Sequence, residues 1–324
     1  YAEGMSYRDF ISAAHGARKG MVDKGVETAR PGEFSKQLLR NSYGMLVQKG
    51  DAQEVEGITY PINHRTVLNR YLAEDVKGSD GKVLAKAGQP VSTDLVARAR
   101  KAGVKNFSVR SPLTSTAMDG IYAKDFGRLP GNQKPMPGTD LGIISAQSLT
   151  EQSTQGVLKK FHSAGAAGAT KSMGFEPVWK LLMGKAPEGE VAAMSPRGGK
   201  IQAIRKLPDG THEVNVGGKV FKASAMPFKY KVGDTVKAGT QLQEGYPEPK
   251  DVLKYKGHRA LQTYLVDEIE RNFGDGAPDR RYIEGVVANL TRYAEVEDPG
   301  DSDYTQGSYV NANALSKFNA DQIK

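Results

Sequence analysis

Cysteine is absent from all 324 residues of the chain. Disulfide bonds and metal sites ligated by thiolates are therefore excluded. Histidine is scarce: five residues lie scattered along the chain, and none of them cluster at the spacing of a metal site. No stretch approaches the roughly 18 consecutive apolar residues that a membrane-spanning helix needs. We expect a protein without disulfides, without zinc, without a membrane span and without a signal peptide.

The charge balance is moderately basic. The chain carries 45 Lys and Arg against 37 Asp and Glu, a formal net charge of +8. This excess is compatible with a nucleic-acid partner, although a basic surface is often only a solvated one. Hydrophobic residues make up 38% of the chain, a low to ordinary share. The length suffices for two or more small domains, and the composition favours a subunit packed into an assembly over one large core.

Residue patterns predict an α+β chain of several modules that is not an autonomous single-core fold. The expected helices cover residues 3–40, 93–102, 176–183, 249–272 and 279–295. The expected strands cover residues 67–72, 83–86 and 107–110, followed by a small antiparallel β domain with turns at Gly198-Gly199, Asp209-Gly210 and Gly217-Gly218. The segments expected to be irregular are residues 41–64, residues 111–140 and the tail from residue 297.

The most informative run is Leu141 to Gly165, in which a helix of small residues leads into a polar-faced helix. Spacings of three, four and seven place Gln155, Leu158, Lys159 and His162 on one helical face. Gln155 can hydrogen-bond sugar hydroxyls, and Lys159 can neutralise phosphate charge. Leu158 can support a flat base, and His162 can donate a hydrogen bond or a proton near a leaving phosphate. A lone helical histidine is more often structural, but these neighbours favour a nucleoside triphosphate site.

This run resembles the trigger loop of multisubunit RNA polymerases, in the beta-prime subunit. Bacterial members of that family have Pro-Gly at the position of Gln152-Ser153. They have Met at the position of Leu158 and Arg at the position of Lys159. Lysine keeps the charge but lacks the bidentate fork, so the resemblance implies looser orientation of the phosphates. It also implies that residues after Gly165 move when a nucleotide binds. The residues that carry the match are Gly142, Ile143, Ile144, Ala146, Gln147, Ser148, Glu151, Thr154, Gln155, Phe161, His162 and Gly165.

A second run, HGARKG, lies in the first expected helix. Arg18 and Lys19 can face phosphates, and Thr28 and Ala29 are small enough to lie under a base pair. On its own this pattern also fits a basic surface helix. It resembles the bridge helix of the same subunit, which crosses the active-site cleft, and it precedes the trigger-loop match in family order. The resemblance implies that Arg18, Lys19, Thr28, Ala29 and Gly32 bind the template.

Two family features are missing. Bacterial members hold zinc through four cysteines ahead of the trigger loop, and the similar segment here has Tyr122 and Asp125 at two of those positions. We expect packing of Tyr122 and Phe126 to hold this lobe instead. The aspartate-rich run that holds the catalytic magnesium does not occur in the chain. The resemblance therefore implies Mg²⁺ at a shared active site, ligated by another chain.

The β domain has a second possible interpretation. The segment from Lys231 to Gly239 resembles the sandwich of biotin and lipoyl carriers, which present a lysine after Ala-Met. Here Pro227 follows Ala225-Met226, so the carrier reading is disfavoured and a scaffold role remains. Beta-prime subunits possess a comparable domain after the trigger loop. The resemblance thus runs in order from about residue 3 to about residue 310.

The resemblance implies a split beta-prime subunit whose C-terminal part is this chain, active only within a complex. The implied partners are beta-like and N-terminal beta-prime-like subunits, DNA template, RNA and nucleoside triphosphates, without a membrane. The alternative is a non-catalytic assembly or nucleic-acid-binding scaffold that kept the shape. The missing zinc cysteines, the substitutions relative to bacterial members and the split before the bridge helix suggest a bacteriophage enzyme. Such an enzyme would be located in the host cytoplasm or the virion. The implied modules are a bridge helix (1–40), a zinc-less jaw-like region (41–140), the trigger loop (141–188), the β domain (189–248) and C-terminal helices with a tail (249–324).

Overall fold

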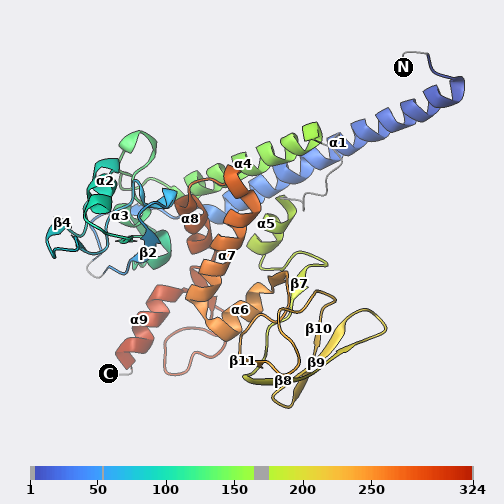
Figure 1. Cartoon of the computed structure of the whole chain (residues 1–324). Coiled ribbons are helices and arrows are strands. Elements are labelled where there is room, and N and C mark those ends of the chain that lie inside the picture. Colours follow the sequence, from blue (N-terminus) through green and yellow to red (C-terminus); the bar gives the residue numbers. More distant parts are fainter. Residues whose placement is uncertain (1–3, 53–54, 164–174, 323–324) are drawn as a thin grey trace.

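A computed structural model describes residues 4–52, 55–163 and 175–322 (Figure 1). It combines helices with small, mostly antiparallel sheets, which confirms the expected α+β class. The helices, including short 3-10 turns, are α1 (Tyr7–Ser42), η1 (Arg65–Val67), α2 (Thr93–Lys101), η2 (Pro112–Thr114), α3 (Ala123–Phe126), η3 (Pro130–Asn132), α4 (Leu141–Ser163), α5 (Phe175–Leu182), α6 (Pro249–Lys256), α7 (His258–Phe273), η4 (Gly274–Gly276), α8 (Arg280–Leu290) and α9 (Ala312–Gln322).

The strands are short except in the small β domain. Those before it are β1 (Val47–Gln48), β2 (Ile58–Pro61), β3 (Val76–Lys77), β4 (Val83–Ala85), β5 (Asn106–Val109) and β6 (Ile121–Tyr122). Those within and after it are β7 (Val191–Ala192), β8 (Gly199–Lys206), β9 (His212–Val216), β10 (Lys219–Ala223), β11 (Thr235–Val236), β12 (Tyr246–Pro247), β13 (Tyr293–Glu295) and β14 (Tyr309–Asn311). In the described part of the chain, no helix is both long enough and apolar enough to cross a membrane.

Helix α1 is the longest element and spans 36 residues. The Ser6 hydroxyl accepts a hydrogen bond from the Asp9 N–H and caps its start, and Arg40 in the last turn suits the negative end of the helix dipole. Helix α4 packs alongside α1, whose N-terminal half extends away from the rest of the molecule (Figure 1). A helix was expected over 3–40, and the observed helix begins later, at Tyr7, and ends two residues later, at Ser42.

The largest apolar core lies where the C-terminal half of α1 meets α4, α5, α7 and α8. Apolar residues recur on the inward faces of these helices, as burial of an amphipathic helix requires. Its fully or nearly fully buried members include Phe34, Leu38, Ala146, Leu149, Val178, Leu181, Val266, Ile269, Ile283, Val286 and Val287.

Residues 41–140 form a lobe that contributes to two further apolar cores, one built from residues 58–109 and one shared with Leu141 and Tyr282. Antiparallel β2 and β5 pair with Tyr60 opposite Phe107, and α2 packs beside β4. The expected strands at 83–86 and 107–110 and the helix at 93–102 are confirmed. The expected strand at 67–72 is wrong because Asn69 has a positive φ of 64°, which interrupts an extended chain. Segments 41–64 and 111–140 are less irregular than expected, since they contain short strands and turns.

The small β domain is a four-stranded antiparallel sheet of order β10-β9-β8-β11. The turn at Asp209-Gly210 joins β8 to β9, and Gly217-Gly218 joins β9 to β10, as expected. The turn expected at Gly198-Gly199 is wrong, because Gly199 is the first residue of β8 and pairs with Val236. The domain encloses its own apolar core.

Three predictions for the C-terminal region are wrong. The helix expected over 249–272 is two helices, because Gly257 has a φ of 84°, a conformation that ends α6 before α7 begins. The helix expected over 279–295 ends at Leu290, and the following residues form β13, which pairs with β14. The tail is not irregular throughout, since β14 and α9 lie in it.

Candidate functional site

The start of α4 is pressed against the end of α1. A Cβ atom at Gly142 would overlap the carbonyl oxygen of Ser42, so only glycine allows the two backbones to approach this closely. One carboxylate also joins the two helices. Asp140 Oδ1 accepts hydrogen bonds from the N–H groups of Gly142 at 3.0 Å and Ile143 at 3.1 Å, while its Oδ2 accepts from the Gly44 N–H at 2.9 Å. Asp140 therefore caps α4 and fixes it to the chain leaving α1.

Helix α8 supports α4 from another side. A Cβ atom at Gly285 would lie 2.6 Å from Ser145 Oγ and 3.2 Å from the Phe126 ring, so this helix crossing also depends on glycine. Ala146 and Leu149 on α4 are fully buried in the main core. The first turns of α4 are thus held between α1 and α8.

The four candidate residues Gln155, Leu158, Lys159 and His162 all lie on α4, which continues without interruption from Leu141 to Ser163. The expected two helical segments are therefore one helix. The side chains of these four residues lie outside the described part of the structure, so their roles stay predictions. The residues directly after Gly165, which were expected to move, also lie outside it, up to residue 174.

The candidate template-binding residues lie on α1. Arg18, Ala29 and Gly32 are exposed, and a Cβ atom at Gly32 would meet no described atom within 4 Å. The side chains of Lys19 and Thr28 lie outside the described part. The template role of these residues stays a prediction.

Asp125, at one of the positions where the resemblance implies zinc ligands, pairs with an arginine. Arg110 Nε donates to Asp125 Oδ1 at 2.7 Å, and Arg110 Nη2 lies 2.6 Å from Asp51 Oδ1. Lys124 Nζ donates to Asp51 Oδ2 at 2.6 Å. Burial raises the pKa of Asp125 more than Arg110 lowers it. Burial also raises the pKa of Asp51, but the hydrogen bonds and charges of Arg110 and Lys124 outweigh this and leave it lowered.

These residues do not fit a zinc ion, because a guanidinium already lies between the two carboxylates. Within residues 4–52, 55–163 and 175–322, no group of three or more His, Cys, Asp or Glu could hold a metal ion. Phe126 is fully buried and packs edge-on against Tyr282, with ring centroids 5.6 Å apart, whereas Tyr122 is only half-buried. The ion pair of Arg110 with Asp125 was missed by sequence reasoning. Its sequence signal is only that two opposite charges, Arg110 and Asp125, lie 15 positions apart.

A second buried cluster, also missed, joins α8 to the lobe of residues 41–140. Arg70 makes a bidentate contact with Glu284, at 2.7 and 3.0 Å, and both side chains are completely buried. Ser111 Oγ and the Tyr60 hydroxyl donate to the same carboxylate at 2.6 and 2.9 Å. Burial alone would raise the pKa of Glu284, but Arg70 and the Ser111 hydrogen bond outweigh it and hold the pKa below its usual value. Because Glu284 adjoins Gly285, this cluster also positions the helix that supports α4.

Comparison with known proteins identifies the family. The model of RNA polymerase Rpb1, domain 5, matches residues 4–194, more than half of the chain. DNA-directed RNA polymerase subunit beta' of Kocuria rhizophila is 32% identical over 96% of this chain and 26% of its own length. The subunits of Micrococcus luteus and Acetivibrio thermocellus are 33% and 30% identical, over 95% and 100% of this chain and 25% and 29% of their lengths. The chain spans about a quarter of these relatives, and it belongs to the family of RNA polymerase Rpb1 domain 5 as a C-terminal part of a beta-prime subunit.

Proposed function

We propose that this chain is part of the catalytic subunit of a multisubunit DNA-dependent RNA polymerase, with α1 as bridge helix and α4 as the first arm of the trigger loop. One observation carries the proposal. The start of α4 is fixed to the end of α1 by Asp140 and by the close approach at Gly142. A nucleotide bound along α4 would therefore be held at a defined place relative to α1, as positioning of an incoming base over a template requires.

On α4, Gln155 hydrogen-bonds the sugar hydroxyls, Leu158 supports the base and Lys159 neutralises phosphate charge in this proposal. His162 donates a hydrogen bond or a proton as the pyrophosphate leaves. Phosphoryl transfer depends mostly on such positioning and charge neutralisation. Magnesium, when bound by aspartates that lie outside these 324 residues, would lower the charge barrier between the attacking and leaving oxygens.

On α1, we assign Arg18 and Lys19 to template phosphates, and Thr28, Ala29 and Gly32 to the surface under the templating base pair. The exposure of Arg18 and Ala29, and the open space at Gly32, support this assignment. A Cβ atom at Gly16 or Gly32 would meet no described atom of this chain within 4 Å, which leaves room in this proposal for nucleic acid to approach α1 closely.

The remaining modules follow the same proposal. Residues 41–140 form the zinc-less lobe, 189–248 a scaffold domain and 249–324 the C-terminal support of α4. Beta-like and N-terminal beta-prime-like chains, DNA, RNA and nucleoside triphosphates are the partners. The bacteriophage origin, and with it a place in host cytoplasm or virion, stays a prediction.

Single-nucleotide addition by the reconstituted complex tests the role of α4. His162→Ala should slow addition about ten-fold or more, as loss of a proton or hydrogen-bond donor does. Lys159→Ala should slow it as well, whereas Lys160→Ala is the matched control, because one residue further along the helix points to another side. Equal rates for the Lys159 and Lys160 variants would contradict the assigned face.

Purification of the tagged chain from its native source separates the two interpretations of the sequence. Recovery of a partner that carries the aspartate-rich magnesium motif supports the catalytic role. A chain recovered with assembly or nucleic-acid partners but without that motif favours the scaffold.

A further inference from the structure

Arg110 joins three segments in the interior of the lobe of residues 41–140. Its Nε and Nη2 atoms both lie 2.7 Å from Asp125 Oδ1 in α3, and Nη2 also lies 2.6 Å from Asp51 Oδ1 in the loop after β1. Arg110 itself directly follows β5. The side chains of Arg110 and Asp125 are only 3% and 4% exposed, so both charges are withdrawn from water. One guanidinium therefore connects the loop after β1, the end of β5 and α3.

The backbone pairing between these segments is short. Strands β1 and β6 run parallel and pair over two residues each, and so small a ladder is not stable by itself. Asp51 lies three residues after the end of β1, and Asp125 lies three residues after the end of β6. Arg110 contacts both carboxylates, so it holds the two chains together just beyond the end of their ladder.

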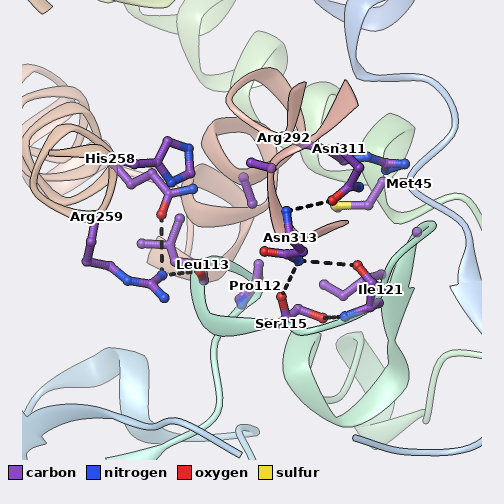
Figure 2. A pocket seen from close by; sticks show the side chains of 15 residues that line it. Met45, Pro112, Leu113, Ser115, Ile121, His258, Arg259, Arg292, Asn311 and Asn313 are labelled. Atoms are coloured by element: carbon purple, nitrogen blue, oxygen red, sulfur yellow. Dashed lines mark hydrogen bonds between the residues drawn. The ribbon is translucent and has the colours of Figure 1, made fainter. Parts of the chain in front are cut away.

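The ion pair also closes a loop. Arg110 and Asp125 are 15 positions apart, and η2 and β6 lie between them. Asn313 of α9 donates to the carbonyl oxygens of Ser115 and Ala117 in this loop, at 3.0 and 3.3 Å (Figure 2). The loop is thus held by α9 in its middle and by the ion pair at its two ends. A structural metal ion likewise closes loops between ligands that lie apart in the sequence.

We propose that the Arg110 guanidinium takes the structural place of the zinc ion that the family resemblance implies in this lobe, with the carboxylates of Asp51 and Asp125 in place of thiolates. The order of charge is the same, because a cation lies between anionic groups from separate segments. Asp125 stands at one of the implied ligand positions, and Lys124 Nζ adds a second cation, 2.6 Å from Asp51 Oδ2. The lobe therefore closes without a metal, whether or not the proposed polymerase chemistry holds.

Hydrogen exchange of the full chain, followed by mass spectrometry, tests the proposal. The probes are the N–H groups of Val47 and Ile121 in the short ladder, which donate to backbone carbonyls at 2.9 Å. Arg110→Met keeps the length of the side chain without its charge and should speed exchange at both probes about ten-fold or more. Arg98→Met is the matched control, since this exposed arginine of the same lobe pairs with Asp94, and it should leave exchange within about two-fold. Unchanged exchange in Arg110→Met overturns the proposal.

A milder variant separates a local opening from a general loss of stability. Asp51 is 35% exposed, so Asp51→Ala leaves the buried pair in place and removes only one connection. It should speed exchange at Val47 and leave the N–H of Leu72, in the neighbouring core, unchanged. Equal acceleration at Val47 and Leu72 would mean a general loss of stability and would overturn the assigned role.

A double variant tests whether the pair does more than fill the interior. Arg110→Met combined with Asp125→Leu removes both buried charges, a replacement that proteins often tolerate. Asp51 still lacks its partner in this variant, so exchange at Val47 should stay fast. Full recovery of protection at Val47 would overturn the connecting role.

A metal comparison completes the test. Excess EDTA, or added Zn²⁺, should leave exchange at Val47 and Ile121 of the wild-type chain unchanged. Faster exchange in EDTA would show that a bound metal closes the lobe, and it would overturn the proposal.

Discussion

Two regions of this molecule are held together by opposite means. The charged joint, defined by Tyr60, Arg70, Ser111, Arg280 and Glu284, fixes α8 to the lobe of residues 41–140 through buried polar contacts. The β domain instead encloses an apolar core, in which Ile201, Val214, Val216 and Leu242 are fully buried. A buried ion pair requires each partner in place, whereas an apolar core loses stability in proportion to the volume removed.

The two kinds of contact, directional and apolar, match the structural task of each region. Within α8, Glu284 of the charged joint is followed by Gly285, which faces Ser145 of α4. A bidentate contact admits one orientation of its partners, so the joint sets where α8 lies and thereby where α4 starts. The β domain is remote from the start of α4 (Figure 1), and its core needs only to be filled. The directional contacts thus lie where the position of a helix matters for the proposed site.

Glu284→Ala should give the largest effect. It leaves Arg70 charged, buried and without its carboxylate, which typically costs about 3–5 kcal/mol in the free energy of unfolding. Urea unfolding of the purified chain measures this loss. Glu188→Ala, which removes an 87% exposed carboxylate paired with Lys180, should leave the unfolding midpoint unchanged. If both variants lost a similar free energy of unfolding, the charged joint would contribute no more to stability than an exposed surface ion pair.

The core of the β domain should respond in steps. Ile201→Val removes one methylene and should cost about 1 kcal/mol, and Ile201→Ala should cost about 3 kcal/mol. Glu284→Asp, by contrast, should cost nearly as much as Glu284→Ala, because the shorter side chain cannot keep both contacts with Arg70. The same urea series measures all four variants. A graded response at Glu284 would contradict the comparison.

Lowering the pH should change the stability contributions of the two regions differently. The folded-state pKa of Glu284 is lowered, so its contribution to stability is present above its unfolded pKa, near 4.3, and is lost as pH falls through the lower folded value. The difference between wild type and Glu284→Gln should therefore shrink below about pH 4, by about 1.4 kcal/mol for each unit by which the two pKa values differ. The difference between wild type and Ile201→Ala should stay constant. Unfolding measured from pH 7 to pH 3 provides the check.

Local signals in the sequence explain which parts of the fold could be predicted. Helix α2 ends at Lys101, just before Gly103, whose φ is 76°, and Gly217-Gly218 forms a hairpin turn, because both signals act within a few residues. The charged joint could not be predicted in this way. Arg70 and Glu284 lie 214 positions apart, and each alone resembles an ordinary surface charge.

The candidate site likewise has one part that the sequence predicts and one part that it does not. Helical spacing is sufficient to place Gln155 and His162 on one uninterrupted helix. It gives no sign that Asp140 connects that helix to Gly44, 96 positions earlier, since such a contact depends on how two helices pack. The anchoring of α4 therefore emerged only from the structure, whereas the chemistry proposed for its residues comes from the sequence and stays a prediction.

Asp140→Ala should have the smallest effect on stability and a disproportionate one on function. Loss of a helix cap costs about 1 kcal/mol, and Ser92→Ala, which removes the cap of α2, should cost a similar amount. Only Asp140 also binds the chain leaving α1, so only its variant should slow nucleotide addition by the assembled complex, by several-fold. If both variants slowed addition equally, general stability and not the α1–α4 connection would explain the loss. If neither did, the close approach at Gly142 alone would suffice to position α4, and the connecting carboxylate would be dispensable for the site.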